Sequence, residues 1–83
     1  MYIIKELDIE GNFEILDIKN ENIEELKKDL VKYIKRKIIK LGVDKYVGGL
    51  DDSINGGFIY SRTETEEGSS IVQYLKYEIL EEI

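Results

Sequence analysis

Side chains that carry oxygen recur at alternate positions of one glycine-rich stretch, at Asp51, Ser53 and Asn55, with Gly56 directly after them. The calcium loop of an EF-hand has oxygen ligands at its first, third and fifth positions, glycine at its sixth and a bidentate glutamate at its twelfth. The twelfth position here is Arg62, a cation where the main carboxylate ligand would stand. We therefore predict no metal and no cofactor at this stretch.

The same stretch has two glycine pairs, at residues 48–49 and 56–57, on either side of Asp51 and Asp52. A phosphate-binding loop opens a helix N-terminus, where backbone N–H groups and the helix dipole favour an anion. This stretch instead precedes a predicted strand and contains two acids of its own. We interpret it as a hinge between a helix and a sheet, whose two aspartates form part of an exposed acidic contact surface.

Catalytic groups are scarce, because the chain has no histidine and no cysteine. Their absence removes imidazole bases, thiol nucleophiles and disulfides, and it leaves every serine without a histidine partner. Lys37 is the one titratable residue near the middle of the apolar stripe of a predicted helix, where a desolvated lysine can act as a nucleophile. A lysine whose stem covers apolar surface while its ammonium reaches water is the commoner case. We predict that the protein is not an enzyme.

The net charge of −6 is distributed unevenly along the chain. Residues 1–19 carry two lysines against five acids (−3), and residues 20–41 carry seven basic residues against four acids (+3). Residues 42–83 carry three basic residues against nine acids (−6). A protein that binds duplex DNA needs a basic surface that neutralises phosphates. We therefore expect no direct DNA binding.

The first pair of predicted elements is a hairpin of two strands, over residues 2–9 and 13–18. A three-residue turn over residues 10–12 would place Ile9 opposite Phe13. In that register one face of the hairpin would be directed toward the core, and it would carry Ile3, Leu7, Ile9, Phe13 and Ile15.

The clearest predicted element is an amphipathic helix that Asn22 can cap and Gly42 can end. Its apolar residues recur at helical spacing and form one stripe. The opposite face is basic, with Lys28, Lys32, Lys35 and Arg36. A solvated helix face explains these cations, and contact with an anion is the functional alternative.

A second hairpin is predicted over residues 57–65 and 70–83, with a turn centred on Glu67 and Gly68. This register would place Phe58 opposite Tyr77. A helix that begins at Ser70, with Ser70 and Gln73 as a capping box, is the alternative for the last segment. The content of isoleucine, valine and tyrosine favours the strand.

The fold class that follows is α+β, in a single domain over residues 1–83. We predict a two-layer ββαββ arrangement, with one helix packed on one face of a mostly antiparallel four-stranded sheet. This order resembles the β-grasp arrangement of ubiquitin-like domains at a similar length. The resemblance is limited to the order of elements.

Exposed acids gather in the predicted loops and at the end of the second hairpin, and such carboxylates can occupy a groove built for phosphates. The residues that we predict to contact a partner are Asp51, Asp52, Glu64, Glu66, Glu67 and Tyr74. We predict a non-enzymatic protein–protein interaction domain, a small acidic inhibitor that blocks a basic nucleic-acid-binding protein. Anti-CRISPR and anti-restriction proteins of phages and mobile elements are similar in size and charge.

Two other functions fit the same residues. The first is a ubiquitin-like adaptor or subunit that contributes its sheet to a stable complex. The second is a protein that binds a small anionic ligand such as a nucleotide, through the helix lysines with Tyr33 or Tyr46. Binding to an acidic surface should weaken with salt, an apolar adaptor interface should not, and a ligand should raise the melting temperature.

The sheet face away from the helix is predicted to be apolar and uncovered. In the predicted register it carries Ile4, Leu16, Ile18, Ile59, Val72, Tyr74 and Leu80. A contiguous apolar patch marks an interface, and a symmetric homodimer is the simplest way to cover it. We therefore predict a homodimer.

The sequence also predicts where the protein acts. No apolar run approaches the roughly 18 residues of a membrane span, and the first ten residues are too densely charged for a secretory signal peptide. We expect a cytoplasmic protein that does not bind membranes.

Overall fold

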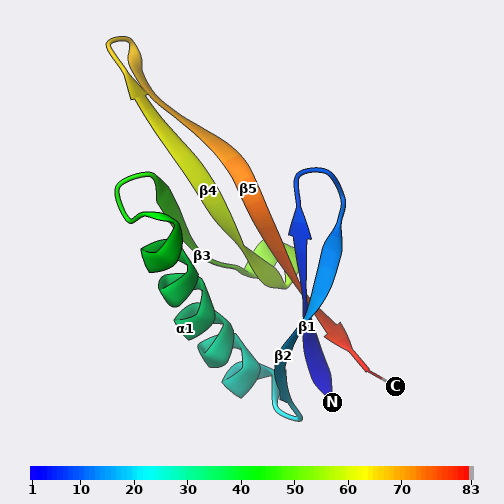
Figure 1. Ribbon diagram of the computed structural model, residues 1–83. Helices are drawn as coiled ribbons and strands as arrows, with labels where there is room; N and C mark the ends of the chain where they lie inside the picture. The colour runs from blue at the N-terminus through cyan, green and yellow to red at the C-terminus, as the bar shows by residue number, and fades with distance from the viewer. Residues whose placement is uncertain (83) are drawn as a thin grey trace.

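The computed structural model of the protein describes residues 1–82 and contains one α-helix and five strands (Figure 1). The elements are β1 (Tyr2–Asp8), β2 (Phe13–Asn20), α1 (Ile23–Leu41), β3 (Tyr46–Asp51), a short 3-10 turn (Asp52–Ile54), β4 (Gly56–Thr65) and β5 (Gly68–Glu81). The strands form one sheet in the order β2-β1-β5-β4-β3, and every neighbouring pair is antiparallel. Helix α1 packs on one face of this sheet. The predicted α+β class, with one helix on an antiparallel sheet, is confirmed.

The sheet has five strands rather than the four predicted, because the glycine-rich stretch forms β3 instead of a loop. Strand β3 pairs with β4 from Tyr46, opposite Ser61, to Asp51, opposite Gly56. The order of elements is therefore ββαβββ. In the β-grasp arrangement the first and last strands run parallel, whereas β1 and β5 here are antiparallel. The resemblance in order does not extend to the sheet.

The glycines of this stretch are needed where backbones approach closely. A Cβ atom added to Gly56 would collide with the carbonyl oxygen of Tyr77, and one added to Gly57 would lie 2.6 Å from the carbonyl oxygen of Gly49. Gly49 itself has open space where its Cβ would be. The glycine pairs therefore serve strand packing more than a hinge.

Helix α1 begins and ends where the sequence predicts. The Asn22 side chain accepts hydrogen bonds from the backbone N–H groups of Glu24 (2.9 Å) and Glu25 (3.1 Å), which satisfies two free donors of the first turn. At the other end, Gly42 has φ 128° and donates its N–H to the carbonyl of Ile38 (2.8 Å). Glycine adopts this conformation without steric cost.

The register of the first hairpin differs from the prediction. Strand β1 ends at Asp8, whose carboxylate accepts hydrogen bonds from the N–H groups of Glu10 and Asn12, both at 2.9 Å. These bonds stabilise a longer turn, so that Phe13 lies opposite Leu7 and not opposite Ile9. The predicted three-residue turn is therefore wrong.

The face of the hairpin that packs toward the helix is also the opposite of the one predicted. The predicted and observed registers differ by two residues, so the same side chains still share a face, and only the direction of that face is wrong. Ile4 is fully buried, and Leu16 and Ile18 pack against the core. Phe13 and Ile15, which were predicted to face the core, are 61% and 47% exposed. The buried core consists of Ile4, Leu26, Leu30, Ile34, Ile59, Leu75, Tyr77 and Ile79.

The predicted composition of the far face is therefore wrong for most of its members. Ile4 and Ile59 are core residues, and Tyr74 packs against Tyr46, which itself borders the core. Leu80 does lie on the far face, since it pairs with Ile3 in β1. The side chains on that face are Ile3, Lys5, Leu7, Phe13, Ile15, Phe58, Lys76, Glu78 and Leu80.

The last segment is a strand, as predicted, and not a helix. Strands β4 and β5 form a long hairpin in which Thr65 pairs with Gly68, so that Glu66 and Glu67 make a two-residue turn. A bulge between Ile59 and Tyr60 shifts the register. Because the turn is centred on Glu66 and Glu67, one residue earlier than predicted, Phe58 lies opposite Lys76 even with this bulge, and the predicted pairing of Phe58 with Tyr77 is wrong.

The molecule is elongated, with extents of 49 × 23 × 23 Å. Figure 1 shows that the end of the β4–β5 hairpin, in yellow and orange, projects past the loop between α1 and β3. Within residues 1–82, no helix has both the length and the apolar character that crossing a membrane requires.

Candidate functional site

The part of the β4–β5 hairpin that projects from the sheet is a two-stranded ribbon. Pairing of β3 with β4 begins at Ser61, and pairing of β1 with β5 begins at Leu75. Residues 62–74 lie beyond both neighbouring strands, and we call them the arm. From Thr63 to Tyr74 every residue is exposed. An isolated two-stranded ribbon is only marginally stable in water, and the arm contributes no residue to the buried core, whose members from β4 and β5 are Ile59, Leu75, Tyr77 and Ile79.

The end of the arm is acidic. Glu64, Glu66 and Glu67 lie at or beside its turn, and residues 63–74 contain no basic residue. The Thr65 hydroxyl donates a hydrogen bond to the carbonyl of Gly68 (3.0 Å), which closes the turn. Three of the six residues predicted to contact a partner are therefore together at the end of a projecting element.

Tyr74 lies at the base of the arm, well away from these glutamates along β5. Its ring packs against Tyr46 with 5.0 Å between ring centroids, and the residue is 36% exposed. Tyr74 therefore anchors the arm to the body of the sheet and still has surface free for a partner.

Asp51 and Asp52 lie at the opposite end of β4 from the acidic turn. Asp51 pairs with Gly56, at the start of β4, whereas Thr65 ends that strand. The Asp51 carboxylate accepts hydrogen bonds from the N–H (2.9 Å) and hydroxyl of Ser53, and Asp52 lies 3.5 Å from the Lys27 ammonium. The two aspartates stabilise a turn and contact the helix, and they do not form one surface with the arm glutamates.

A second cluster, which no pattern in the sequence had predicted, surrounds Glu6 on the helix side of β1. The Glu6 carboxylate accepts hydrogen bonds from the hydroxyls of Tyr77 (2.6 Å) and Tyr33 (3.2 Å). The Lys37 ammonium lies 3.8 Å from it. The Glu6 side chain is 11% exposed, so a nearly buried carboxylate is held by three partners from β5 and α1.

The phenols of this cluster are held in the neutral form. Burial, followed by the charge of Glu6 and the hydrogen bond to it, raises the pKa of Tyr33 to about 12. Burial and the hydrogen bond to Glu6 also raise the pKa of the fully buried Tyr77. Neutral hydroxyls donate to the carboxylate and do not repel it. Lys37 on the apolar stripe was the sequence signal that pointed toward this cluster.

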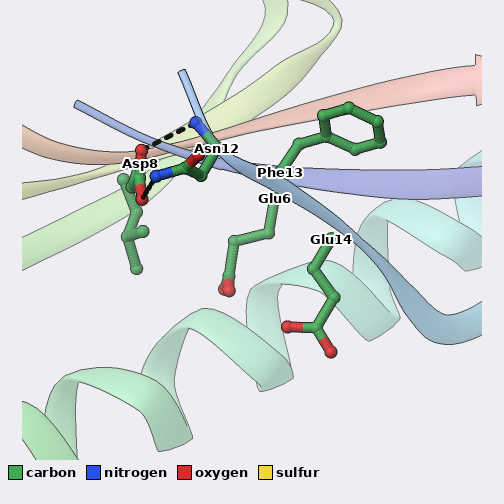
Figure 2. A pocket seen from close by; sticks show the side chains of 6 residues that line it. Glu6, Asp8, Asn12, Phe13 and Glu14 are labelled. Carbon is green, nitrogen blue, oxygen red and sulfur yellow. Dashed lines mark hydrogen bonds between the residues drawn. The ribbon is translucent and has the colours of Figure 1, made fainter. Parts of the chain in front are cut away.

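A hollow of about 250 Å³ adjoins this cluster at the end of the β1–β2 hairpin. Its lining consists of Glu6, Asp8, Asn12, Phe13, Glu14 and Leu75. Figure 2 shows that Glu6 and Glu14 point to the same side of the hairpin, toward the helix, whereas Phe13 points away. Asp8 is held by its hydrogen bonds with Asn12, which Figure 2 draws as dashed lines. The hollow is acidic and suits a cationic group.

A smaller hollow, of about 150 Å³, lies along the second half of α1 and is lined by Tyr33, Arg36, Lys37 and Lys40. Three of its four lining residues are cations. Tyr46, the other tyrosine considered for an anionic ligand, lies in β3 and packs against Tyr74. Only one of those two tyrosines therefore lies beside the helix lysines.

Metal ligands are not gathered anywhere in the described part of the chain. Within residues 1–82, no three side chains of histidine, cysteine, aspartate or glutamate are placed to hold an ion together. Asp51, Ser53 and Asn55 belong to the turn between β3 and β4, where Asn55 has φ 53° and ends the 3-10 turn.

Comparisons with protein-family models, with curated proteins and with solved structures give no match.

Proposed function

We propose that the protein is a non-enzymatic interaction domain that blocks a basic, nucleic-acid-handling protein by inserting its acidic arm into the groove of that partner. The observation that carries this proposal is the arm itself. A ribbon with three glutamates at its end, no cation from Thr63 to Tyr74 and no neighbouring strand projects from the sheet. Anti-CRISPR and anti-restriction proteins of phages and mobile elements are the kind of inhibitor that we have in mind, acting in the cytoplasm.

Electrostatics supports such a role for two reasons. A groove that binds nucleic acid concentrates positive potential, and a field of the opposite sign speeds association with it. The projecting geometry also allows the arm to enter a groove without a collision of the sheet or helix with its walls. The chain as a whole has a net charge of −6, so it does not compete for the phosphates themselves.

The proposal is tested with matched charge reversals and capture from lysate of the native host. One variant changes Glu64, Glu66 and Glu67 to lysine, and a control variant makes the same change of charge at Asp17, Glu21 and Asp44, which are exposed. We expect the parent and the control to capture the same basic nucleic-acid-binding protein, with capture weakening as salt rises. The arm variant should lose it. Equal capture by the arm variant, or salt-independent capture, would contradict the proposal.

The hollow beside α1 favours a second candidate function, which is binding of a small anionic ligand. Arg36, Lys37 and Lys40 surround a volume of about 150 Å³, and Tyr33 closes one side. If this function is correct, a nucleotide or phosphate should raise the melting temperature of the parent. The same ligand should leave an Arg36→Glu/Lys40→Glu variant unchanged. Lys37 is kept in this test because it also contacts Glu6.

A further inference from the structure

Strand β5 has a free edge along the arm. Its residues from Gly68 to Tyr74 pair with β4 on one side only, whereas β1 occupies the other side from Leu75 to Glu81. Figure 1 shows that the β1–β2 hairpin turns away from β5 where the arm begins. Backbone N–H and C=O groups along such an edge are a template for an additional strand.

The residues along this edge lack the charged side chains and prolines that usually prevent strand addition. No charged residue occurs from Gly68 to Leu75, and Ile71 and Val72 are 57% and 61% exposed. The opposite edge of the arm, on β4, carries Arg62 and Glu64. Proteins commonly protect exposed edges with charged side chains or proline. Of the two edges of the arm, only that of β5 is open in this way.

The acidic hollow lies at one end of this free edge. Leu75, the first residue that pairs with β1, lines the hollow together with its partner Asp8. Across the β1–β2 pair, Glu6 lies directly opposite Glu14, and like charges in that position destabilise a sheet. Within residues 1–82, Lys37 contacts Glu6 and no ion pair forms with Glu14. A cation in the hollow would relieve this repulsion.

We propose that the free edge of β5 receives an extended segment of the basic partner as an added strand, with a lysine or arginine side chain in the acidic hollow. A second basic side chain would face Glu66 and Glu67 at the other end of the edge. The segment spans seven residues, or about 23 Å at ~3.3 Å per residue. This inference rests on the proposed function and specifies how the partner binds.

Charge argues against a second copy of the chain as the added strand. Two antiparallel copies of the full edge would place Gly68 of one beside Tyr74 of the other. The acidic turn of each arm would then lie against the carboxylates of the hollow in the other copy, a contact between groups of the same sign. A basic segment meets acids at both ends.

The test uses a synthetic seven-residue peptide, Arg-Thr-Val-Thr-Val-Thr-Arg with blocked ends, and the full protein labelled for NMR. We expect the peptide to slow hydrogen exchange of amides between Gly68 and Tyr74. A peptide N-methylated at alternate residues, and one with glutamate at both ends, should have no effect. Glu14→Gln should raise the Kd of the peptide about tenfold, as expected for one lost charge-assisted hydrogen bond. Asp17→Asn, on the same strand but outside the acidic hollow, should not.

Three results would overturn the inference. The first is that the peptide does not bind, and the second is that slower hydrogen exchange is confined to other strands. The third is that exchange at the β5 edge slows with rising protein concentration alone, together with a dimeric mass. The capture experiment separates this failure from that of the proposed function. If reversal of the arm charges abolishes capture but the peptide leaves β5 unprotected, only the added strand is wrong. If capture survives that reversal, the proposed function is wrong whatever the peptide does.

Discussion

At the scale of single residues, Glu6 has an unusual environment for a carboxylate. A carboxylate that is 11% exposed is stabilised by two phenol hydroxyls and one ammonium, which come from residues 27 to 71 positions away along the chain. A buried charge is tolerated only when it is paired and hydrogen-bonded. We therefore expect this cluster to fix the position of α1 against β1 and β5.

The tyrosines of this cluster predict how stability depends on pH. The folded-state pKa of Tyr33 is about 12, above the ordinary value of 10, and that of Tyr77 is raised as well. The folded state therefore holds protons that the unfolded state releases first, so the stabilisation is complete below pH 10 and declines as pH rises toward 12. Urea titrations should show a falling free energy of unfolding across this window.

The control for this pH dependence is Tyr33→Phe with Tyr77→Phe, which removes both groups. The fall in stability between pH 10 and 12 should be shallower in this variant than in the parent. An equal fall in both proteins would show that other groups govern alkaline unfolding.

The sequence could suggest Lys37 as unusual but could not identify Glu6 as its partner. A lysine on an apolar stripe is visible in a helical pattern, because the period of the helix is known. Glu6 faces inward because it shares a face of β1 with the buried Ile4, and the sequence pattern had predicted the opposite face to be turned to the core.

At the scale of elements, close backbone packing predicts unequal costs for two glycines of the same stretch. Gly56→Ala should lower the free energy of unfolding by about 2 kcal/mol or more, because its Cβ would collide with the backbone of Tyr77. Gly49→Ala should change it by less than about 0.5 kcal/mol, since open space surrounds that position. Urea denaturation of the two variants measures both values. Similar costs would contradict the packing of β4 on β5.

Two adjacent aspartates should also behave differently. Asp51 accepts hydrogen bonds from Ser53 at the start of the 3-10 turn, so Asp51→Ala should cost about 1 kcal/mol, as the loss of a cap does. Asp52 forms one exposed ion pair with Lys27, and Asp52→Ala should cost less. Thermal unfolding with and without calcium gives the test. Stabilisation of the parent by calcium would contradict the assignment of these residues to a turn.

The strands and the helix were easier to predict than their pairing. The caps at Asn22 and Gly42 are local signals and gave the helix its correct bounds. Strand β3 was missed because its glycines have low strand propensity, and their role depends on a neighbouring backbone that the sequence does not show. The bulge after Ile59 is likewise set by the sheet and not by a local pattern.

At the scale of the whole molecule, we still predict a homodimer, but the residues expected to form its interface differ from those that the sequence suggested. The far face of the sheet carries Phe13, Ile15 and Leu80, which are exposed and lie among paired charges. If this face forms the interface, Phe13→Glu with Leu80→Glu should give a folded monomer that melts at a lower temperature. Ile39→Glu, an exposed apolar position on the helix, is the control. Light scattering that shows the parent to be monomeric at high concentration would refute the dimer.

The acidic end of the second hairpin could be predicted, since glutamates beside a glycine in a turn are a local pattern. The projection of this hairpin end from the sheet could not be predicted. It depends on where β1 stops pairing with β5, at Leu75, and on where β3 stops pairing with β4, at Ser61. The structure places Glu64, Glu66 and Glu67 together at the end of the arm, whereas Asp51 and Asp52, which the predicted contact set grouped with them, lie at the far end of β4.

The most direct measurement of the central proposal is competition for the captured basic protein. Its purified form would be mixed with a fluorescent nucleic acid that it binds, and anisotropy would follow the release of that nucleic acid as the acidic protein is added. We predict complete displacement by the parent, weaker displacement at higher salt, and none by the Glu64→Lys/Glu66→Lys/Glu67→Lys variant. Binding of the parent while the nucleic acid stays bound, as a ternary complex, would contradict the account.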